Sequence, residues 1–167
     1  MFSPDSDGGF GNLQKGHAVA FADFDRDGDQ DVFEVLGGAY PGDSYFSVLL
    51  ENPGHGREWI GLKLTGVKSN RGAIGARVAL ELSDGRMIYR TVQPGSSFGD
   101  TPLEVHAGLG SAKHVKSVEI RWPSGGVQKL GPLAAGAVYD VTEGAAIANR
   151  LQIGRFAFSK HVQGAHH

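Results

Sequence analysis

The chain has 167 residues, of which 26 are glycine and none is cysteine, and its formal net charge is -2 from 16 basic and 18 acidic side chains. This balance, without runs of basic residues, argues against nucleic acid or an anionic membrane surface as a partner. The lack of cysteine excludes disulfides and thiolate metal sites, and no apolar stretch is long enough to predict a membrane span. So many glycines are typical of tight turns and favour an all-β protein.

Residues 1–16 are polar and glycine-rich without hydrophobic periodicity, so we expect an N-terminal loop. The segment lacks the charged-then-apolar order of a signal peptide. An exported parent protein would therefore carry its signal upstream, or would already have lost it. The length predicts one domain, or one domain with a small appendage.

The first predicted strands, at 17–24 and 32–38, lie on either side of an acidic loop, and a third follows at 47–52. A clean alternation of apolar and polar residues then begins at Trp59 and predicts half-buried strands at 59–66 and within 73–85. Asp84-Gly85 signals a hairpin to a partner strand at 86–92. The face that we expect to be buried comprises Ile60, Leu62, Leu64, Ile74, Ala76, Val78, Leu80 and Leu82.

The series of short strands continues to residue 144. The segments are 103–110, 115–122 (with Val118, Ile120 and Trp122 on one face), 127–130 and 137–144. Short strands separated by turn signals every 8–12 residues or so are typical of two architectures. We therefore predict an all-β fold, either an antiparallel β-sandwich or a partly open barrel, with the hairpin that carries the acidic loop appended.

Residues 145–167 differ from the strands before them. A helical turn is expected at 145–151 and a stray strand at 154–162, followed by a polar tail. One interpretation is a frayed end. The other is that Phe156 and Phe158 dock on the chain's own sheet or on the open sheet edge of a neighbour.

The acidic loop holds five aspartates in nine residues, in the pattern D-x-D-x-D-G-D-x-D. Carboxylates this close repel one another unless a cation lies between them. Positions 1, 3 and 5 can point inward together, the glycine at position 6 permits a sharp turn, and oxygens at positions 7 and 9 complete an all-oxygen shell that suits Ca²⁺ better than Mg²⁺. The predicted ligands are Asp23, Asp25, Asp27, the carbonyl of Asp29, and Asp31.

Glu34 falls at position 12 of this pattern, so the formal EF-hand motif is also met. An EF-hand loop lies between helices, whereas both flanking segments here are β-like. The prediction is therefore a calcium loop within a β-hairpin, with Glu34 at most an accessory. The alternative is a solvated acidic turn that binds nothing specific.

Two parts of the chain resemble known families. The stretch "GHAVAFADFDRDGDQDVF" resembles the FG-GAP/VCBS repeat, a β-propeller blade whose hairpin carries a calcium loop. The stretches "LTGVKSNRGAIGARV", "PGSSFGD", "HAGLGSAKHVKSVEIRWPSG" and "VYDVTEG" resemble the ASPIC/UnbV domain of cartilage acidic protein 1-like proteins and many bacterial surface or secreted proteins. The expected division is an N-terminal loop at 1–16, the calcium-loop hairpin at 17–56, the ASPIC/UnbV-like domain at 57–144 and a tail at 145–167.

The resemblance implies an extracellular or cell-surface protein with a binding role and no established catalytic activity. Such proteins usually carry several FG-GAP repeats, and one blade cannot close a propeller. The chain is therefore expected to be the end of a longer protein, or a short version whose blade remnant packs on the ASPIC/UnbV domain. The expected partner is a protein or a glycan, with Trp59 and Trp122 as core residues or as sugar-stacking platforms.

Two rival functions follow from other features. Open sheet edges and the apolar tail suit a subunit that assembles into a homo-oligomer or fibre. The stretch "GSSFG" places Ser97 in a nucleophile-elbow pattern with His106 and Asp140 downstream, but a β-like segment follows it where that motif needs a helix. We therefore expect a glycine-rich loop there and not a hydrolase.

Overall fold

The computed structural model describes residues 16–38, 41–42, 46–52, 54, 56–95, 99, 101–155 and 157. In this part of the chain every regular element is a strand, which confirms the all-β prediction. No helix of the described residues is long and apolar enough to cross a membrane. The strands are β1 (Gly16–Ala22), β2 (Asp31–Leu36), β3 (Val48–Leu50), β4 (Glu58–Thr65), β5 (Arg77–Leu82), β6 (Met87–Thr91), β7 (Val105–Gly110), β8 (His114–Arg121), β9 (Val127–Leu130), β10 (Leu133–Ala134), β11 (Ala137–Thr142) and β12 (Asn149–Arg150).

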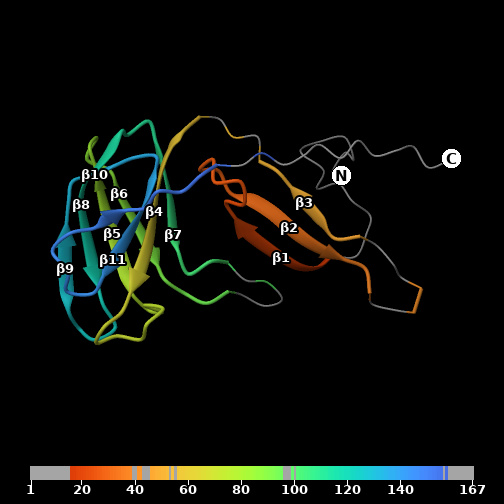
Figure 1. The fold of residues 1–167 in the computed structure, drawn as a ribbon, viewed down its shortest axis with the longest axis horizontal. Coiled ribbons are helices and arrows are strands. Elements are labelled where there is room, and N and C mark those ends of the chain that lie inside the picture. The colour runs from red at the N-terminus through yellow and green to blue at the C-terminus, as the bar shows by residue number, and fades with distance from the viewer. Residues whose placement is uncertain are drawn as a thin grey trace.

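The strands form a small sheet and a sandwich. Strands β1, β2 and β3 pair antiparallel in that order, so the third predicted strand, at 47–52, pairs with the predicted hairpin. One sheet of the sandwich has the order β10-β8-β5-β6, with β9 also paired to β8, and the other has the order β12-β11-β4-β7. Figure 1 shows the sandwich at one end of the molecule and the three-stranded sheet beside it. Of the two predicted architectures, the structure has the β-sandwich.

The hydrophobic core lies in the sandwich. Its fully buried side chains come from alternate positions of the strands, as the period-2 pattern predicts, and include Ile60, Leu62, Val78, Leu80, Leu82, Val118 and Ile120. Among the described residues, no member of this core comes from the three-stranded sheet, whose own buried apolar side chains are Val32 and Leu36. The described hydrophobic cluster of the sandwich is therefore built without side chains of the small sheet.

Local turn chemistry follows the prediction in one place and departs from it in another. The β5–β6 hairpin turns at Asp84-Gly85, where Gly85 has a φ of 86° and Asp84 Oδ1 accepts the Arg86 N–H at 3.1 Å. Ile74, which we predicted to be buried, is 40% exposed, and β5 begins only at Arg77. The preceding residues form a turn in which Asn70 Oδ1 accepts the Ile74 N–H at 2.8 Å. The apolar alternation of the sequence therefore begins before the start of β5, within this turn.

One pairing differs from the predicted antiparallel arrangement. Strand β11 runs parallel to β4, with Ala137 opposite Ile60 and Val141 opposite Leu64. The chain leaves the five-stranded sheet at β10 and enters the four-stranded sheet at β11. This crossing between layers, and not a hairpin, sets the direction of β11.

Glu143, just after β11, ties three loops together. Its carboxylate accepts the N–H groups of Val67, Lys68 and Ser69 at 2.7, 2.7 and 2.8 Å, and the hydroxyls of Ser69 and Ser124 at 3.0 and 2.6 Å. Burial opposes its ionisation, but these bonds outweigh burial and lower the pKa of Glu143 to about 2. The carboxylate thereby joins the loop after β4, the turn after β8 and the end of β11.

The segment after residue 144 joins the sandwich at residues 149–151. The helical turn predicted at 145–151 is wrong, because Asn149–Arg150 form β12 on β11 and the Leu151 N–H donates to the Val138 carbonyl at 2.8 Å. A frayed end is therefore wrong for residues 145–151 and stays an open interpretation for the rest of the tail. Phe156 and Phe158, predicted to dock on a sheet, lie outside the described residues, as does nearly all of the predicted N-terminal loop.

Candidate metal centre and the adjoining cleft

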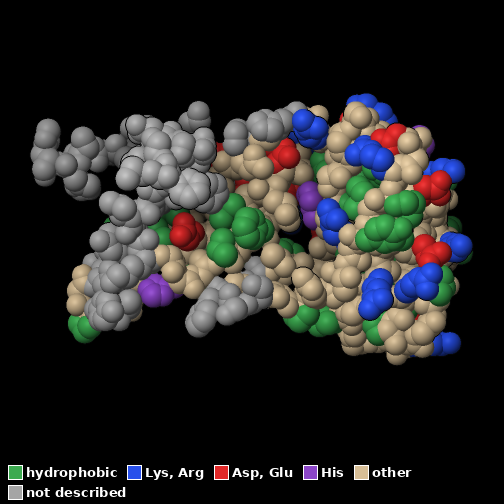
Figure 2. Space-filling view, turned by 180° about the vertical axis from the view of Figure 1, so that it is seen from behind, with side chains coloured by type: hydrophobic (Ala, Val, Ile, Leu, Met, Phe, Trp, Pro, Cys, Tyr) green, Lys and Arg blue, Asp and Glu red, His purple; other side chains and the backbone are tan. Residues whose placement is uncertain are grey.

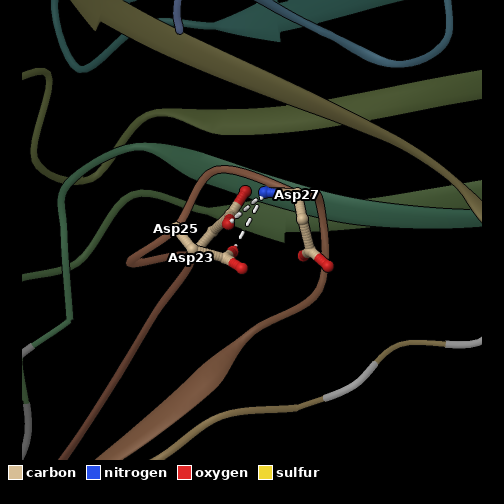
Figure 3. Close-up of side chains that lie close together, drawn as sticks. All are labelled: Asp23, Asp25 and Asp27. Atoms are coloured by element: carbon tan, nitrogen blue, oxygen red, sulfur yellow. Dashed lines mark hydrogen bonds between the residues drawn. The ribbon is translucent and has the colours of Figure 1, made fainter. Parts of the chain in front are cut away.

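Three of the five loop aspartates come together between β1 and β2. One carboxylate oxygen from each of Asp23, Asp25 and Asp27 lies within 4.8 Å of the others. Figure 3 shows the three side chains gathered on this loop, with the Asp27 amide directed at the carboxylates of the other two. Both elements that flank the loop are strands, and Glu34 lies within β2. This is the arrangement of a β-hairpin loop, whereas an EF-hand loop lies between two helices.

Backbone amides hold the three carboxylates in place. The Asp27 N–H donates to Asp23 Oδ1 and Asp25 Oδ1 at 3.0 and 3.1 Å, and the Gly28 N–H donates to Asp23 Oδ2 at 3.0 Å. The Asp29 N–H donates to Asp27 Oδ1 at 2.8 Å. Each oxygen has two lone pairs, so one amide bond leaves room for a cation ligand bond. Hydrogen bonds within the loop therefore hold its backbone coiled around the three carboxylates.

The electrostatics of the cluster favour a cation. Asp25 is 7% exposed, and in the described part of the chain no ion pair involves any of the three carboxylates. Burial, together with the neighbouring carboxylates of Asp27 and Asp25, raises the pKa of Asp23 to about 6, although the amide bonds from Gly28 and Asp27 oppose this shift. An all-oxygen donor set of this charge suits a hard divalent cation, and Ca²⁺ in particular.

The two remaining aspartates have other surroundings. Asp31 is 1% exposed and accepts the N–H groups of Phe24 and Asn52, both at 2.9 Å, which closes the base of the loop against the segment after β3. The carboxylate of Asp29 lies where a Cβ on Gly54 would overlap it. Cation ligation by Asp23, Asp25, Asp27, the Asp29 carbonyl and Asp31 stays a prediction.

The aspartate loop is anchored on the sandwich. Gly28 has a φ of 105°, and a Cβ on it would overlap the indole nitrogen of Trp59 in β4. The Trp59 ring stacks on His106 of β7, with ring centroids 5.5 Å apart and planes 5° from parallel. Arg155 donates to the Asp27 carbonyl at 2.9 Å. The backbones of Gly99 and Val19 also lie in close contact. A Cβ on Gly99 would overlap the Val19 carbonyl.

A cleft of about 480 Å³ lies where the loop meets the sandwich. Its walls come from five segments: the aspartate loop, β4, the β6–β7 connection with the adjoining ends of these strands, the start of β11, and β12 with the residues after it. Figure 2 shows Lys/Arg and histidine side chains gathered beside a hollow at this junction. The charged side chains of the lining are Asp23, Arg26, Arg90, Glu104, Arg150 and Arg155.

Two titratable groups that line the cleft have shifted pKa values: Glu104, just before β7, and His106, within β7. Burial raises the pKa of Glu104, and the Asp23 carboxylate raises it further, while Arg26 and Lys63 oppose this shift. Burial lowers the pKa of His106, and Arg90 adds to the effect, with Asp29 acting in the opposite direction. At neutral pH the imidazole is therefore neutral.

The cleft was not predicted from the sequence. Its residues come from five separate segments, so no spacing in the chain reveals it. One local signal was available: Gly61 interrupts the outward face of β4, and a Cβ there would crowd the Glu104 carboxylate and Val138. A strand glycine of this kind often marks a close approach of another group.

The other sequence candidates are placed as follows. Trp122 is 4% exposed and donates to Gln128 Oε1 at 2.9 Å, so it is a core residue, whereas Trp59 is half-buried beside the loop. His106 lies in β7 and Asp140 in β11, on opposite sides of β4. Ser97 lies outside the described residues.

The Glu143 network joins the very stretches on which the resemblance to ASPIC/UnbV rests. The ASPIC and UnbV family model matches residues 66–148. The ASPIC and UnbV region thus spans the chain from the loop after β4 to the residues just before β12, and it contains Glu104 and His106 of the cleft. The aspartate loop and Trp59 precede it. No curated protein matches the chain.

Proposed function

We propose that this chain is a calcium-binding, non-catalytic interaction module of a secreted or cell-surface protein. The observation that carries the proposal is the convergence of Asp23, Asp25 and Asp27 within 4.8 Å on a strand-flanked loop. Extracellular calcium sites of this class have dissociation constants of roughly 10⁻⁴–10⁻³ M, so even a weak site would be filled outside the cell.

The role of calcium in this proposal is structural. The ion would neutralise the three carboxylates and so fix the loop against Trp59 and the sandwich. The aspartate loop between β1 and β2 also supports the resemblance to an FG-GAP/VCBS blade, whose calcium loop lies in a hairpin. The blade would then pack on the ASPIC and UnbV region through the contact between Gly28 and Trp59.

A binding role without catalysis has one support, because the match to the ASPIC and UnbV family model suggests a non-catalytic module. If any esterase activity is found, Ser97→Ala should leave it unchanged, and its loss would support a hydrolase instead.

Calcium binding can be tested by thermal unfolding and tryptophan emission in EDTA, in Ca²⁺ and in Mg²⁺. With a dissociation constant near 10⁻⁴ M, about 2 mM Ca²⁺ adds about 1.8 kcal/mol, which raises Tm by about 4–7 °C. We expect a smaller effect of Mg²⁺ and a change in the emission of Trp59, whose indole touches Gly28.

Asp25→Asn should abolish the calcium-dependent rise in Tm, because it removes a buried ligand charge. Asp84→Asn, which makes the same change of charge in the exposed β5–β6 turn, should leave the rise unchanged. Trp59→Phe should remove the emission change but retain the rise. Equal Tm values in EDTA and Ca²⁺ for the wild-type chain would refute the calcium site.

Assembly into oligomers is a second candidate function. Exposed apolar side chains on the three-stranded sheet favour it, with Val19, Phe21 and Leu49 at 43, 42 and 39% exposure. Light scattering of the full chain over a range of concentrations tests this directly. A monomer at every concentration would exclude it.

A further inference from the structure

The cleft between the aspartate loop and the sandwich has the features of a ligand site. Its volume of about 480 Å³ falls in the range of roughly 300–1,000 Å³ that is usual for small-molecule pockets. Residues from both parts of the molecule line it, and binding sites commonly form at such junctions. The contact between Gly28 and Trp59 fixes one wall against the other.

Positive charge is in excess in this cleft. Four arginines line it (Arg26, Arg90, Arg150 and Arg155), against the carboxylates of Asp23 and Glu104. Among the described residues none of the four arginines takes part in an ion pair. Arg90 and Arg155 donate instead to backbone carbonyls, those of His106 and Asp27, which fixes the orientation of their guanidinium groups. A planar guanidinium is well suited to bind a carboxylate or sulfate through two hydrogen bonds.

The uncharged lining suits a ligand with many hydroxyl groups. The side chains of Gln30, Gln93 and Gln152 line the cleft, and each amide can both donate and accept hydrogen bonds. Trp59 supplies an aromatic surface in the same wall. A compact anion such as phosphate would use the arginines but would leave these groups without partners.

We propose that this cleft binds an acidic saccharide, in which a sugar ring carries a carboxylate or a sulfate group. The arginines would bind the anionic group. The glutamine amides would donate hydrogen bonds to the sugar hydroxyls and accept from them, and the carboxylates of Asp23 and Glu104 would accept hydrogen bonds from these hydroxyls. This inference deepens the proposed interaction role by naming the ligand class. It does not require calcium, although Asp23 belongs to both sites.

Isothermal titration calorimetry of the full chain at low ionic strength tests the proposal with matched probes. Digalacturonate carries the carboxylates, digalactose is its neutral counterpart, sulfated digalactose carries the other anionic group, and inorganic sulfate is the anion alone. We expect one of the acidic disaccharides to bind at least about tenfold more tightly than digalactose and than sulfate, because charge-assisted hydrogen bonds add to those of the ring. Which of the two binds identifies the anionic group.

Variants locate the binding. Arg26→Asn suits the positive φ of 63° at that position, and Arg150→Gln retains a polar side chain. Each should weaken binding of the acidic disaccharide by about tenfold. Arg77→Gln, at an exposed position of β5, is the matched control and should bind as the wild-type chain does.

Three results would overturn the proposal: no binding of either acidic disaccharide at about 10 mM, equal affinity for digalactose, or equal affinity for inorganic sulfate. Loss in the Arg77→Gln control as large as in the cleft variants would also overturn it. The calcium proposal is judged separately. A wild-type chain with a calcium-dependent Tm but no saccharide binding contradicts only this inference, and the reverse result contradicts only the calcium site.

Discussion

The surroundings of two acidic side chains, Glu143 and Asp23, shift their pKa values in opposite directions. Glu143 is surrounded by five hydrogen-bond donor contacts and has a pKa of about 2, whereas burial raises the pKa of Asp23 to about 6. The first carboxylate is stabilised as an anion by the fold itself. The fold stabilises the anionic form of Asp23 poorly. This is the arrangement expected of a carboxylate whose negative charge a bound cation would stabilise.

Glu143→Gln should lower the melting temperature at neutral pH by several degrees, because a neutral amide cannot replace a carboxylate that accepts three consecutive N–H groups. The folded pKa lies below the ordinary value of 4.5, so this stabilisation is present above pH 4.5 and is lost as the pH falls toward 2. Thermal unfolding of both proteins from pH 7 to pH 2.5 measures the difference in Tm.

That difference should shrink steadily below pH 4.5. Glu81→Gln is a useful comparison, because Glu81 is paired with Lys116 on an exposed strand face and surface pairs contribute little. A Glu143→Gln variant with the Tm of the wild-type chain at pH 7 would show that the three loops do not depend on this carboxylate.

At the level of elements, the junction between the aspartate loop and β4 depends on a glycine. Gly28 stands at the sixth position of the calcium pattern, where the turn requires a positive φ. The structure adds a second requirement, because the Trp59 indole occupies the space that a Cβ would need. One glycine thus serves both the loop's shape and its contact with the sandwich.

Gly28→Ala should therefore be more destabilising than a comparable change elsewhere. Gly85→Ala is the matched control, since its φ of 86° is similar but no atom lies within 4 Å of the added Cβ. The control should lose about 1–2 kcal/mol of unfolding free energy from backbone strain alone. Gly28→Ala should lose more, and its tryptophan emission should shift as Trp59 is displaced. Equal losses in urea denaturation would mean that the contact with Trp59 contributes nothing.

For the whole molecule, the distribution of the core predicts two levels of stability. The sandwich holds the main hydrophobic cluster, while the three-stranded sheet buries only Val32 and Leu36 among its described apolar residues. Regions with few buried apolar contacts open at lower free-energy cost. The small sheet is then the part that gains most from a bound cation.

Hydrogen exchange in EDTA and in Ca²⁺ tests this expectation. Amides of β1–β3 should exchange faster than those of β5 and β8 in EDTA, and Ca²⁺ should slow β1–β3 while β5 and β8 change little. With Asp25→Asn the two conditions should give the same exchange. Uniform slowing across both sheets of the sandwich would indicate instead that the molecule unfolds as one unit.

The sequence alone determined those features that depend on near neighbours. Alternation predicted the buried faces of β4, β5 and β8, Asp84-Gly85 predicted a hairpin, and the spacing of the aspartates predicted that Asp23, Asp25 and Asp27 converge. Each of these follows from strand period or from the backbone freedom of glycine, which act over a few residues. The same local rule failed at Ile74, where the Asn70 side chain bonds the backbone into a turn.

Only the tertiary structure decided how distant segments meet. It set the parallel pairing of β11 with β4, the place of β12 where a helical turn was predicted, and the contact of Gly28 with Trp59. The arginine-lined cleft belongs to the same class, because its walls come from segments up to 133 positions apart, from Ala22 to Arg155. Such sites arise from the packing of whole elements, and their residues carry no shared spacing in the chain.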